Sequence, residues 1–175
     1  MNLHLGCGTK WHPDYINIDR QQRPNVDSVE DIRFLLKYPV GSVKKIYACH
    51  VLEHFGRWEF ATVLRRWYEL LYGGGRLRIA VPDFSACVQI FSEDGNVNKI
   101  LGLLYGGQDY DVNFHKMIWT FESMKRDLES VGFRNVGRYD WENDDFADID
   151  DYSKAYLPHM DKNGTLMSLN MEGFK

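Results

Sequence analysis

The sequence predicts an α/β fold with a largely parallel sheet, and three observations lead to this prediction. Short apolar runs typical of strands alternate with segments whose apolar residues recur at helical spacing. The first run ends at Leu5 and leads into the turn Gly6-Cys7-Gly8, and the next run ends at Asp19. Strands joined by right-handed crossovers lie parallel, and ligands bind beyond their carboxyl ends. We therefore expect the residues that follow the strands to gather at one edge of the sheet.

Three short strands are expected at the start of the chain, near residues 2–6, 15–19 and 27–30. The link between the first two is unusually short, because residues 9–14 leave room for little more than a turn. Pro13 within this link suits a turn or a helix start. Since parallel strands are usually joined through a full helix, the first helix is predicted to be vestigial.

The middle of the chain predicts two strands and two helices. A fourth strand is expected over residues 44–49, and the segment after it places apolar residues on one helical face: Phe60, Val63, Leu64, Trp67, Leu70 and Leu71. Gly73 to Gly75 are expected to stop that helix. Residues 77–81 predict a fifth strand that ends at Pro82, and a helix is expected from Phe84 to about Phe91.

The last third of the chain predicts one helix and a final hairpin. A helix near residues 121–131 is expected to begin at Thr120 and to end at Gly132. Residues 135–141 and 166–174 are the expected final strands, with a long acidic insertion between them. The acids of this insertion lack the glycine and the terminal glutamate of a calcium loop. The insertion is therefore predicted to be a solvated loop.

Composition limits the classes of protein to consider. With 175 residues, 44% of them hydrophobic and 26% charged, the chain predicts a single domain spanning residues 1–175. No apolar run approaches the roughly 18 residues of a membrane span, and no targeting segment is recognised. Cys7, Cys49 and Cys87 have neither metal-ligand nor close-pair spacing, so a reducing, cytoplasmic location is expected. A net charge of −4 argues against nucleic acid as a partner.

The glycine turn and the acid after the second strand predict a binding site for an adenosine-containing cofactor. Glycines at positions 6 and 8 remove Cβ atoms where the backbone passes close to a ligand, and Asp19 can accept hydrogen bonds from two ribose hydroxyls. The dinucleotide fingerprint fits poorly. Its third glycine would fall at Trp11, and its acid lies about 20 residues beyond the glycines, whereas Asp19 comes much sooner.

Five segments, in order, resemble the motifs of class I S-adenosylmethionine-dependent methyltransferases. They are Leu5-Gly6-Cys7-Gly8, Asp19, Glu30-Asp31-Ile32, Cys49-His50-Val51-Leu52-Glu53-His54, and Gly73-Gly74-Gly75-Arg76-Leu77-Arg78-Ile79. The similarity covers nearly the whole chain and is greatest to small methyltransferase-like proteins with a His-Val-Leu-Glu-His … Val-Pro-Asp pattern. The resemblance implies a Rossmann-like class I methyltransferase sheet of about seven strands, mostly parallel with a C-terminal antiparallel hairpin. It also implies an enzyme that uses S-adenosyl-L-methionine.

The resemblance assigns the cofactor-binding residues. Leu5, Gly6, Cys7 and Gly8 form the glycine loop, Asp19 holds the ribose, and His50 faces the cofactor near the sulfonium. The carboxylate of Asp31 or the backbone of Ile32 addresses the adenine amino group, and Glu30 or Asp27 could serve in place of Asp31. The sequence departs from the pattern at His4, where the family usually has an acid. We predict His4 to be a strand histidine whose hydrogen bonds are satisfied by backbone.

The acceptor side is predicted from the polar residues after the fourth strand. His50, Glu53, His54 and His115 are the catalytic candidates, since a hydroxyl acceptor needs a base within hydrogen-bond reach, whereas a carboxylate acceptor needs none. Asp83 is a further candidate for the base. Residues 105–116, with their glycines and mixed polar and aromatic side chains, suit a lid. The resemblance implies a small molecule or a saccharide-linked molecule as the acceptor.

Two alternatives stay open at this point. The pattern H-x-x-E-H from His50 to His54 is also the inverted zinc-protease signature, with Glu53 as general base. Its context is wrong, because His50 directly follows a strand and Gly56 interrupts shortly after His54, so no metal is expected. The second alternative is a regulatory protein that binds S-adenosylmethionine without catalysis, which the short first helix and His4 favour.

Overall fold

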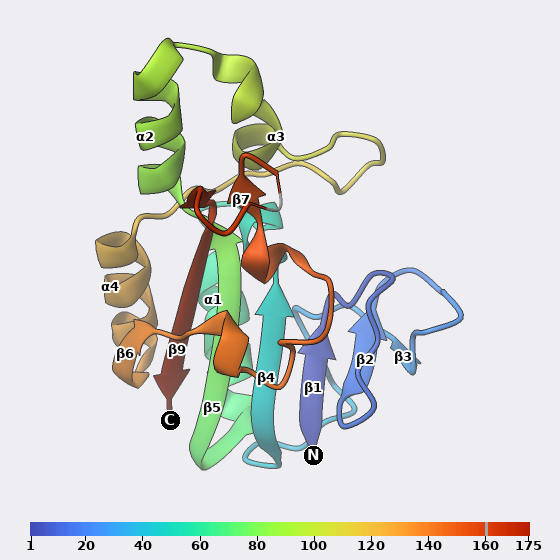
Figure 1. Cartoon of the computed structure of the whole chain (residues 1–175). Helices are drawn as coiled ribbons and strands as arrows, with labels where there is room; N and C mark the ends of the chain where they lie inside the picture. The colour runs from blue at the N-terminus through green and yellow to red at the C-terminus, as the bar shows by residue number, and fades with distance from the viewer. Residues whose placement is uncertain (160) are drawn as a thin grey trace.

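A computed structural model describes residues 1–159 and 161–175 of the chain. Its central feature is a seven-stranded sheet with the strand order β3-β2-β1-β4-β5-β9-β6 (Figure 1). The strands are β1 (Asn2–Leu5), β2 (Ile16–Asp19), β3 (Ser28–Val29), β4 (Val43–Cys49), β5 (Leu71–Pro82), β6 (Arg134–Arg138) and β9 (Ser168–Phe174). β1 to β5 pair in parallel, whereas β9 is antiparallel to both of its neighbours. The predicted mostly parallel sheet with a C-terminal antiparallel hairpin is confirmed.

The connection between β1 and β2 consists of turns and contains no helix. Leu5 pairs with Ile18, and the amide of Cys7 donates to the carbonyl oxygen of Ile18 over 3.0 Å. The glycine turn is thus held directly against β2. The predicted loss of the first helix is confirmed, and it places the turn beside Asp19.

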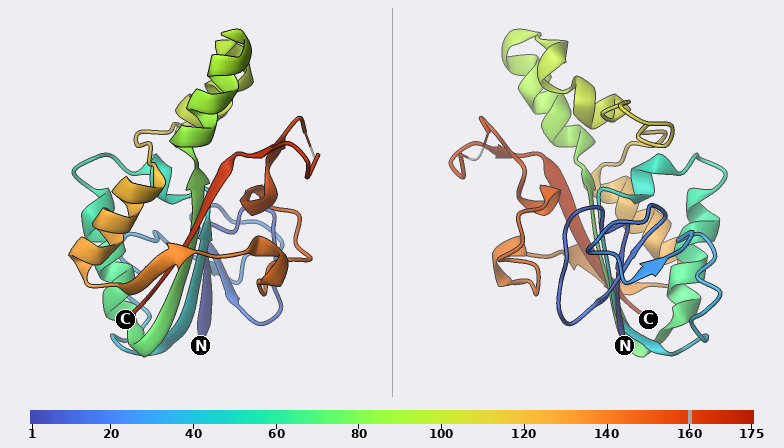
Figure 2. Two further views of the ribbon diagram at one scale, coloured as in Figure 1. Left: turned by 60° about the vertical axis from the view of Figure 1, so that its left-hand side comes forward. Right: turned by 90° about the vertical axis from the view of Figure 1, so that its right-hand side faces the viewer.

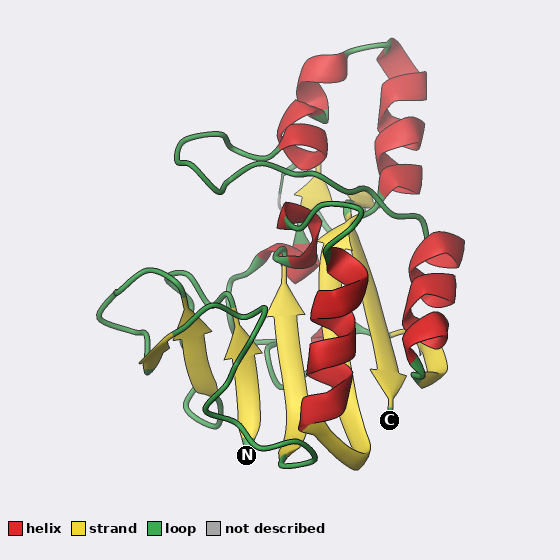
Figure 3. Ribbon diagram, turned by 180° about the vertical axis from the view of Figure 1, so that it is seen from behind, coloured by secondary structure: helices red, strands yellow, loops and turns green. Residues whose placement is uncertain are grey.

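Two amphipathic helices, α1 (Phe60–Leu70) and α4 (Phe121–Val131), cover one face of the sheet (Figure 3). The face of α1 that is buried carries four of the apolar residues predicted for it: Val63, Leu64, Trp67 and Leu70. α4 begins with a capping box at Thr120 and ends at Gly132, as the sequence predicts. These helices bury the apolar side chains of the sheet on that face.

The glycine run lies within β5 rather than at the end of α1. The helix ends at Leu70, and Leu71 already has extended backbone and pairs with Val43 of β4. The ladder between the two strands is irregular between Val43 and Lys45, which accommodates the glycines. The prediction that Gly73 to Gly75 stop the helix is therefore wrong. The chain pairs with β4 from Leu71 onward, so the helix has already ended before the glycines.

Three short elements form an arm beyond the carboxyl end of β5 (Figures 1 and 2). They are α2 (Phe84–Asp94), the 3-10 helix η2 (Val97–Lys99) and α3 (Leu101–Tyr105). Asp83 caps α2 by accepting a hydrogen bond from the amide of Ser85 over 2.9 Å.

Within the described residues, no helix has both the length and the apolar character needed to cross a membrane.

The insertion between β6 and β9 covers the face of the sheet opposite to α1 and α4 (Figure 2). It contains η3 (Trp141–Asn143), η4 (Tyr152–Lys154), β7 (Tyr156–Leu157) and β8 (Thr165–Leu166). Phe146 stacks on Tyr47 of β4 with ring centroids 3.6 Å apart. The β1 to β2 and β4 to β5 connections run in opposite directions across the sheet, so right-handed crossovers lie on opposite faces. The insertion therefore covers the face that the missing first helix would occupy.

Three acids of this insertion contact side chains of the sheet. The side chain of Asp144 is 2% exposed and pairs with Arg78 of β5. Asp145 lies beside lysine and arginine side chains of β4 and β5, and Asp151 accepts a hydrogen bond from the Tyr47 hydroxyl over 2.6 Å. The prediction of a solvated loop is wrong for these three acids, because the covered sheet face carries basic and phenolic groups.

Candidate functional site

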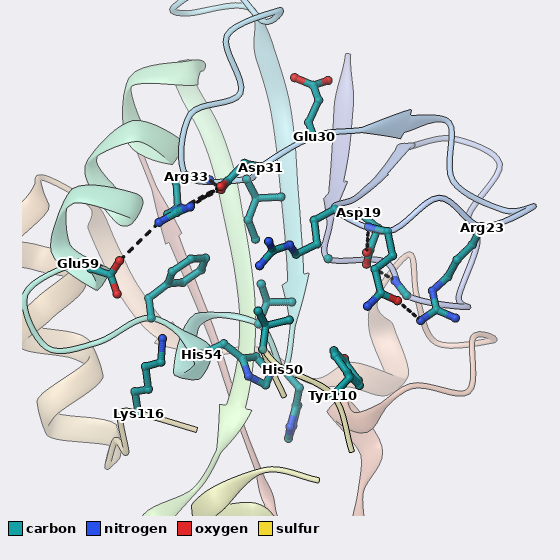
Figure 4. Close-up of a pocket in the computed structure, with 18 residues that line it drawn as sticks. Asp19, Arg23, Glu30, Asp31, Arg33, His50, His54, Glu59, Tyr110 and Lys116 are labelled. Atoms are coloured by element: carbon teal, nitrogen blue, oxygen red, sulfur yellow. Dashed lines mark hydrogen bonds and ion pairs between the residues drawn. The ribbon is translucent and has the colours of Figure 1, made fainter. Parts of the chain in front are cut away.

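A cavity of about 220 Å³ opens at the carboxyl ends of β1, β2 and β4 (Figure 4). Six of the residues predicted to bind an adenosine cofactor line it: Gly6, Gly8, Asp19, Asp31, Ile32 and His50. The two others do not, since Leu5 is buried in the core and Cys7 lines a neighbouring cavity. The folded chain thus brings together residues from four of the five sequence motifs, and the segment from Gly73 to Ile79 contributes none.

The glycine turn forms the floor of this first cavity at the end of β1. Gly6 and Gly8 have φ angles of +65° and +56°, a conformation that residues with a Cβ seldom adopt. A Cβ added to Gly6 would lie 2.4 Å from Cγ2 of Val51, whereas one added to Gly8 would meet no atom within 4 Å. Gly6 is therefore required by both backbone conformation and packing, and Gly8 leaves open space in front of the backbone.

Asp19 stands at the end of β2 with its carboxylate directed at the glycine turn. One oxygen, Oδ2, accepts a hydrogen bond from the amide of Gly8 over 2.9 Å, and Oδ1 accepts one from the amide of Gln21 over 2.8 Å. Each carboxylate oxygen can accept more than one hydrogen bond. The carboxylate is therefore fixed in orientation by backbone amides and retains acceptor capacity toward the cavity.

Asp31 lies at the other end of the cavity and is bound to Arg33 (Figure 4). The guanidinium meets both carboxylate oxygens at 2.6 to 3.0 Å and holds the pKa of Asp31 below its usual range. Ile32 uses its carbonyl oxygen to accept a hydrogen bond from the Trp67 indole over 2.9 Å. Glu30 also lines the cavity, and its carboxylate points away from the other labelled side chains (Figure 4).

His50 follows β4 in a left-handed conformation, with φ of +52°. Its amide donates to the carbonyl oxygen of Ala80 over 2.8 Å, which ties this strained residue to the end of β5. The ring is buried, and burial lowers the pKa of His50 to about 3. The imidazole is therefore neutral at physiological pH.

A second cavity of about 580 Å³ adjoins the first one. Residues shared by the two cavities are Gly6, Gly8, His50, His54 and Tyr110. Its other walls come from the α3 arm, the loop that carries His115, and the insertion around η4. His50, His54, Tyr110 and Lys116 lie together on one side of the first cavity (Figure 4). The folded chain therefore places two chambers on either side of the segment that follows β4.

Glu53 lies behind this segment, on the 3-10 helix η1 (Leu52–His54), and its side chain is fully buried. Oε1 lies 3.4 Å from Nδ1 of His50 and 3.8 Å from Nε2 of His115. Burial raises the pKa of Glu53 to about 8 and lowers the pKa values of His54 and His115. All four predicted catalytic side chains are therefore neighbours in the fold.

Comparisons with known proteins bear on this architecture. No protein-family model matches the chain, and no curated protein matches its sequence. A SAM-dependent methyltransferase from Archaeoglobus fulgidus matches in structure with a TM-score of 0.60 and 15% identity, over 99% of this chain and 85% of that one. The Burkholderia thailandensis 1,6-didemethyltoxoflavin-N1-methyltransferase with bound S-adenosylhomocysteine matches with a TM-score of 0.62 and 16% identity, over 99% and 70%.

The chain has the fold of the class I S-adenosylmethionine-dependent methyltransferases. This confirms the fold that the five sequence motifs predict. Within the methyltransferase fold, the first cavity lies at the carboxyl ends of β1, β2 and β4, where the strand order reverses, and ligands of such sheets bind at this reversal.

Two residues considered from the sequence take structural roles in the methyltransferase fold. The ring of His4 is buried and hydrogen-bonds to Oδ1 of Asn17 over 3.0 Å, so the prediction of a backbone partner is wrong and a side chain is the partner. Asp83 caps α2 and contacts Arg138 at 3.2 Å, and it lines neither cavity. Asp83 is therefore removed from the acceptor chemistry.

The zinc-protease pattern does not have the local structure that its signature requires. The signature places two histidines one turn apart on the same face of a long helix. Here His50 is a strained residue at the end of β4, and His54 closes a three-residue 3-10 helix. The peptidase arrangement from His50 to His54 is therefore absent from the described structure.

Arg20 and Tyr152 were missed by reasoning from the sequence, whereas Tyr110 and Lys116 belong to the segment that the sequence predicts as a lid. Tyr110 and Lys116 reach the first cavity from the loop after α3, and Arg20 follows Asp19 directly. Tyr152 of the insertion lies 5.3 Å from His50 between ring centroids. Only Arg20 had a usable signal, since it follows a predicted strand end. Tyr152, and the contact of Tyr110 and Lys116 with the first cavity, depend on loops whose paths are set by tertiary packing.

Proposed function

We propose that this chain is a methyltransferase that binds S-adenosyl-L-methionine in the first cavity and methylates an acceptor in the second. The observation that carries the proposal is the junction of the two cavities at the glycine turn and the segment after β4. Methyl transfer is an in-line displacement, and alignment of donor and acceptor accounts for most of its acceleration. Two adjoining chambers with a shared wall meet that requirement.

The residues of the first cavity fit the chemistry of an adenosyl cofactor. Gly6 and Gly8 allow close approach to the backbone, and Asp19 has acceptor capacity for the ribose hydroxyls. Because Arg33 engages the Asp31 carboxylate and the Trp67 indole engages the Ile32 carbonyl oxygen, the main-chain amide of Ile32 is the better partner for the adenine. When bound, the cofactor supplies an electrophilic methyl group carried on a sulfonium.

The histidines of the shared wall are suited to handle the proton of an acceptor hydroxyl. Burial lowers the pKa values of His54 and His115, so both rings are neutral at pH 7 and keep a free lone pair. The pKa of His50, at about 3, makes that ring too weak a base, so His54 and His115 are the better candidates. Lys10, Lys99 and Asp151 among the second cavity's lining give it a polar character. A small polar acceptor or a saccharide-linked one is proposed on this basis.

Calorimetric titration with S-adenosylmethionine and S-adenosylhomocysteine tests the proposal without knowledge of the acceptor. The unmodified chain should bind both ligands and should give no heat with NAD. Asp19→Ala should weaken binding by about 100-fold or more, because hydrogen bonds from ribose hydroxyls to a charged group are worth about 1.5–3 kcal/mol each. Asp148→Ala, at an exposed acid of the insertion, is the matched control and should bind normally.

Absence of binding by either adenosyl ligand would overturn the proposal. Equal binding by the unmodified chain and Asp19→Ala would refute the assignment of the first cavity. A screen for transfer of labelled methyl groups to polar acceptors then separates an enzyme from a protein that only binds the cofactor.

A further inference from the structure

The described structure buries one carboxylate without a hydrogen-bond partner, at the wall between the two cavities. The Glu53 side chain is 0% exposed, and among the described residues neither Oε1 nor Oε2 receives a hydrogen bond. Its main-chain carbonyl accepts hydrogen bonds from the amides of Lys116 and Met117, over 2.7 and 3.3 Å. These backbone bonds draw His115 toward Glu53. An unpaired buried carboxylate is costly, so it indicates a missing positive partner.

The hydrogen bonds of two histidines determine which nitrogen each presents to this carboxylate. Nδ1 of His115 lies 2.8 Å from the carbonyl oxygen of Leu103, and Nδ1 of His54 lies 3.2 Å from that of Phe114. A carbonyl oxygen only accepts, so each Nδ1 carries the hydrogen. In the neutral rings Nε2 is then a bare lone pair. Carbonyl groups that fix the opposite nitrogen are the usual supports of metal-binding histidines.

The same reasoning applies to His50, through a short chain of hydrogen bonds. Asn170 donates its amide hydrogen to the carbonyl oxygen of Ser153 over 2.7 Å, which fixes Oδ1 as the atom facing Ser168. The Ser168 hydroxyl donates to that Oδ1 over 3.0 Å, so its oxygen accepts from Nε2 of His50 at 3.3 Å. Nδ1 of His50 therefore also turns a lone pair toward Glu53.

We propose that Glu53, His54 and His115 form a binding site for one divalent transition-metal ion of the zinc type. One ligand atom from each of the three residues lies within 4.8 Å of the others. Ligands about 2.0–2.1 Å from a tetrahedral zinc ion are roughly 3.4 Å apart. The 3.8 Å from Nε2 of His115 to Oε1 of Glu53 is already near that separation. Small side-chain rotations close the remaining gap.

The donor set selects the class of cation. Two imidazoles and one carboxylate suit zinc and neighbouring transition metals, whereas magnesium and calcium prefer oxygen ligands. Three protein ligands leave at least one coordination position open, as in catalytic zinc sites. His54 and His115 both line the second cavity, so the open position faces it. His50 is a positioning residue that contacts Glu53 from the first cavity.

The proposed metal site also limits the chemical class of the acceptor, and this consequence rests on the proposed function. A metal ion at the wall of the second cavity would bind an acceptor through an oxygen donor and lower the pKa of a hydroxyl. Because the metal would occupy the lone pairs of His54 and His115, the hydroxyl proton would leave to water while the oxygen keeps its electron pair. A hydroxylated acceptor is therefore favoured over a carboxylate or an amine.

Metal titration of the whole chain, after removal of ions with a chelator, tests the site. We expect one equivalent of Zn²⁺ to bind in calorimetry, with no comparable heat from Mg²⁺. Co²⁺ should give the strong visible absorption of a four- or five-coordinate ion. Glu53→Gln and His115→Ala should each weaken Zn²⁺ binding by about 100-fold or more, beyond the roughly 10- to 100-fold loss caused by outer-shell changes.

Asp148→Asn is the control, since this acid is exposed, lies outside the cluster and lines neither cavity. It should bind Zn²⁺ like the unmodified chain, and circular dichroism of each variant verifies folding. The proposal is overturned if the unmodified chain binds no Zn²⁺, if Mg²⁺ binds as tightly, or if the Glu53 and His115 variants keep full affinity. If the unmodified chain binds no Zn²⁺, the Glu53 side chain is a neutral carboxylic acid that needs no metal.

Titration of the same samples with S-adenosylhomocysteine separates this proposal from the proposed function. Binding of the nucleoside without Zn²⁺ overturns the metal site alone. Binding of Zn²⁺ without the nucleoside overturns the methyltransferase proposal and leaves the metal site standing.

Discussion

His4 occupies the sheet face that the insertion covers, and its ring is only 3% exposed. Nδ1 donates to Oδ1 of Asn17, and the ring meets Phe146 edge-on with centroids 4.8 Å apart. Burial lowers the pKa of His4 from 6.5 to about 4. Protonation of the buried ring at low pH is therefore unfavourable in the folded chain, and the free energy of unfolding should fall as the pH is lowered.

The sign and size of this effect follow from the two pKa values. The unfolded chain protonates His4 near pH 6.5, so it binds more protons than the folded chain at lower pH, and stability decreases on acidification. Each pKa unit is worth about 1.4 kcal/mol. A folded pKa of about 4 corresponds to a total loss of about 3 kcal/mol, of which about 2.5 kcal/mol is lost by pH 4.5.

Urea denaturation at pH 7 and pH 4.5, with His4→Gln beside the unmodified chain, measures this loss. The glutamine amide can still donate to Asn17, so the variant keeps the hydrogen bond without the titration. The unmodified chain should lose about 2.5 kcal/mol more than the variant between the two pH values. His159→Gln removes an exposed histidine and should not change the difference. An equal loss in His4→Gln and the unmodified chain would refute the reasoning.

The remaining predictions concern stability and use the same denaturation assay. Gly6→Ala should lower the free energy of unfolding by about 2–5 kcal/mol. The left-handed backbone costs a residue with a Cβ about 1–2 kcal/mol, and the clash with the packed Val51 side chain adds to that cost. Gly8→Ala meets no neighbouring atom and should cost only about 1–2 kcal/mol, so equal costs would contradict the packing argument. Arg78→Met should cost about 3–5 kcal/mol by stranding the buried Asp144, and a change below 1 kcal/mol would refute the pairing. Thr120→Ala should cost about 1 kcal/mol through loss of the capping box, and an unchanged urea midpoint would refute the capping role.

The fold was predictable because its signals are local in the sequence. Hydrophobic spacing marked the strands and the buried face of α1, and the Thr120 and Gly132 signals marked both ends of α4. The glycine run misled, because three glycines are a local helix-stop signal while the pairing of Leu71 with Val43 is a long-range contact. Strand pairing of this kind leaves no mark within one short window of sequence.

The site was most predictable where its residues follow strands. Gly6, Asp19 and His50 come directly after predicted strands or end them, and parallel pairing carries all of them to one edge of the sheet. Tyr110 and Lys116 reach the same cavity from a loop far along the chain. Their approach depends on backbone hydrogen bonds such as those to Glu53, which no periodicity encodes.

The sequence by itself determined the order of strands and helices, the glycine turn and the acid beside it, because each is set by residues close together in the chain. The tertiary structure alone decided that the acidic insertion replaces the first helix on the sheet. It also decided that Glu53 is buried without a partner and that His115 lies next to it. Burial and the meeting of distant side chains depend on how the whole chain packs, so they emerge only in three dimensions.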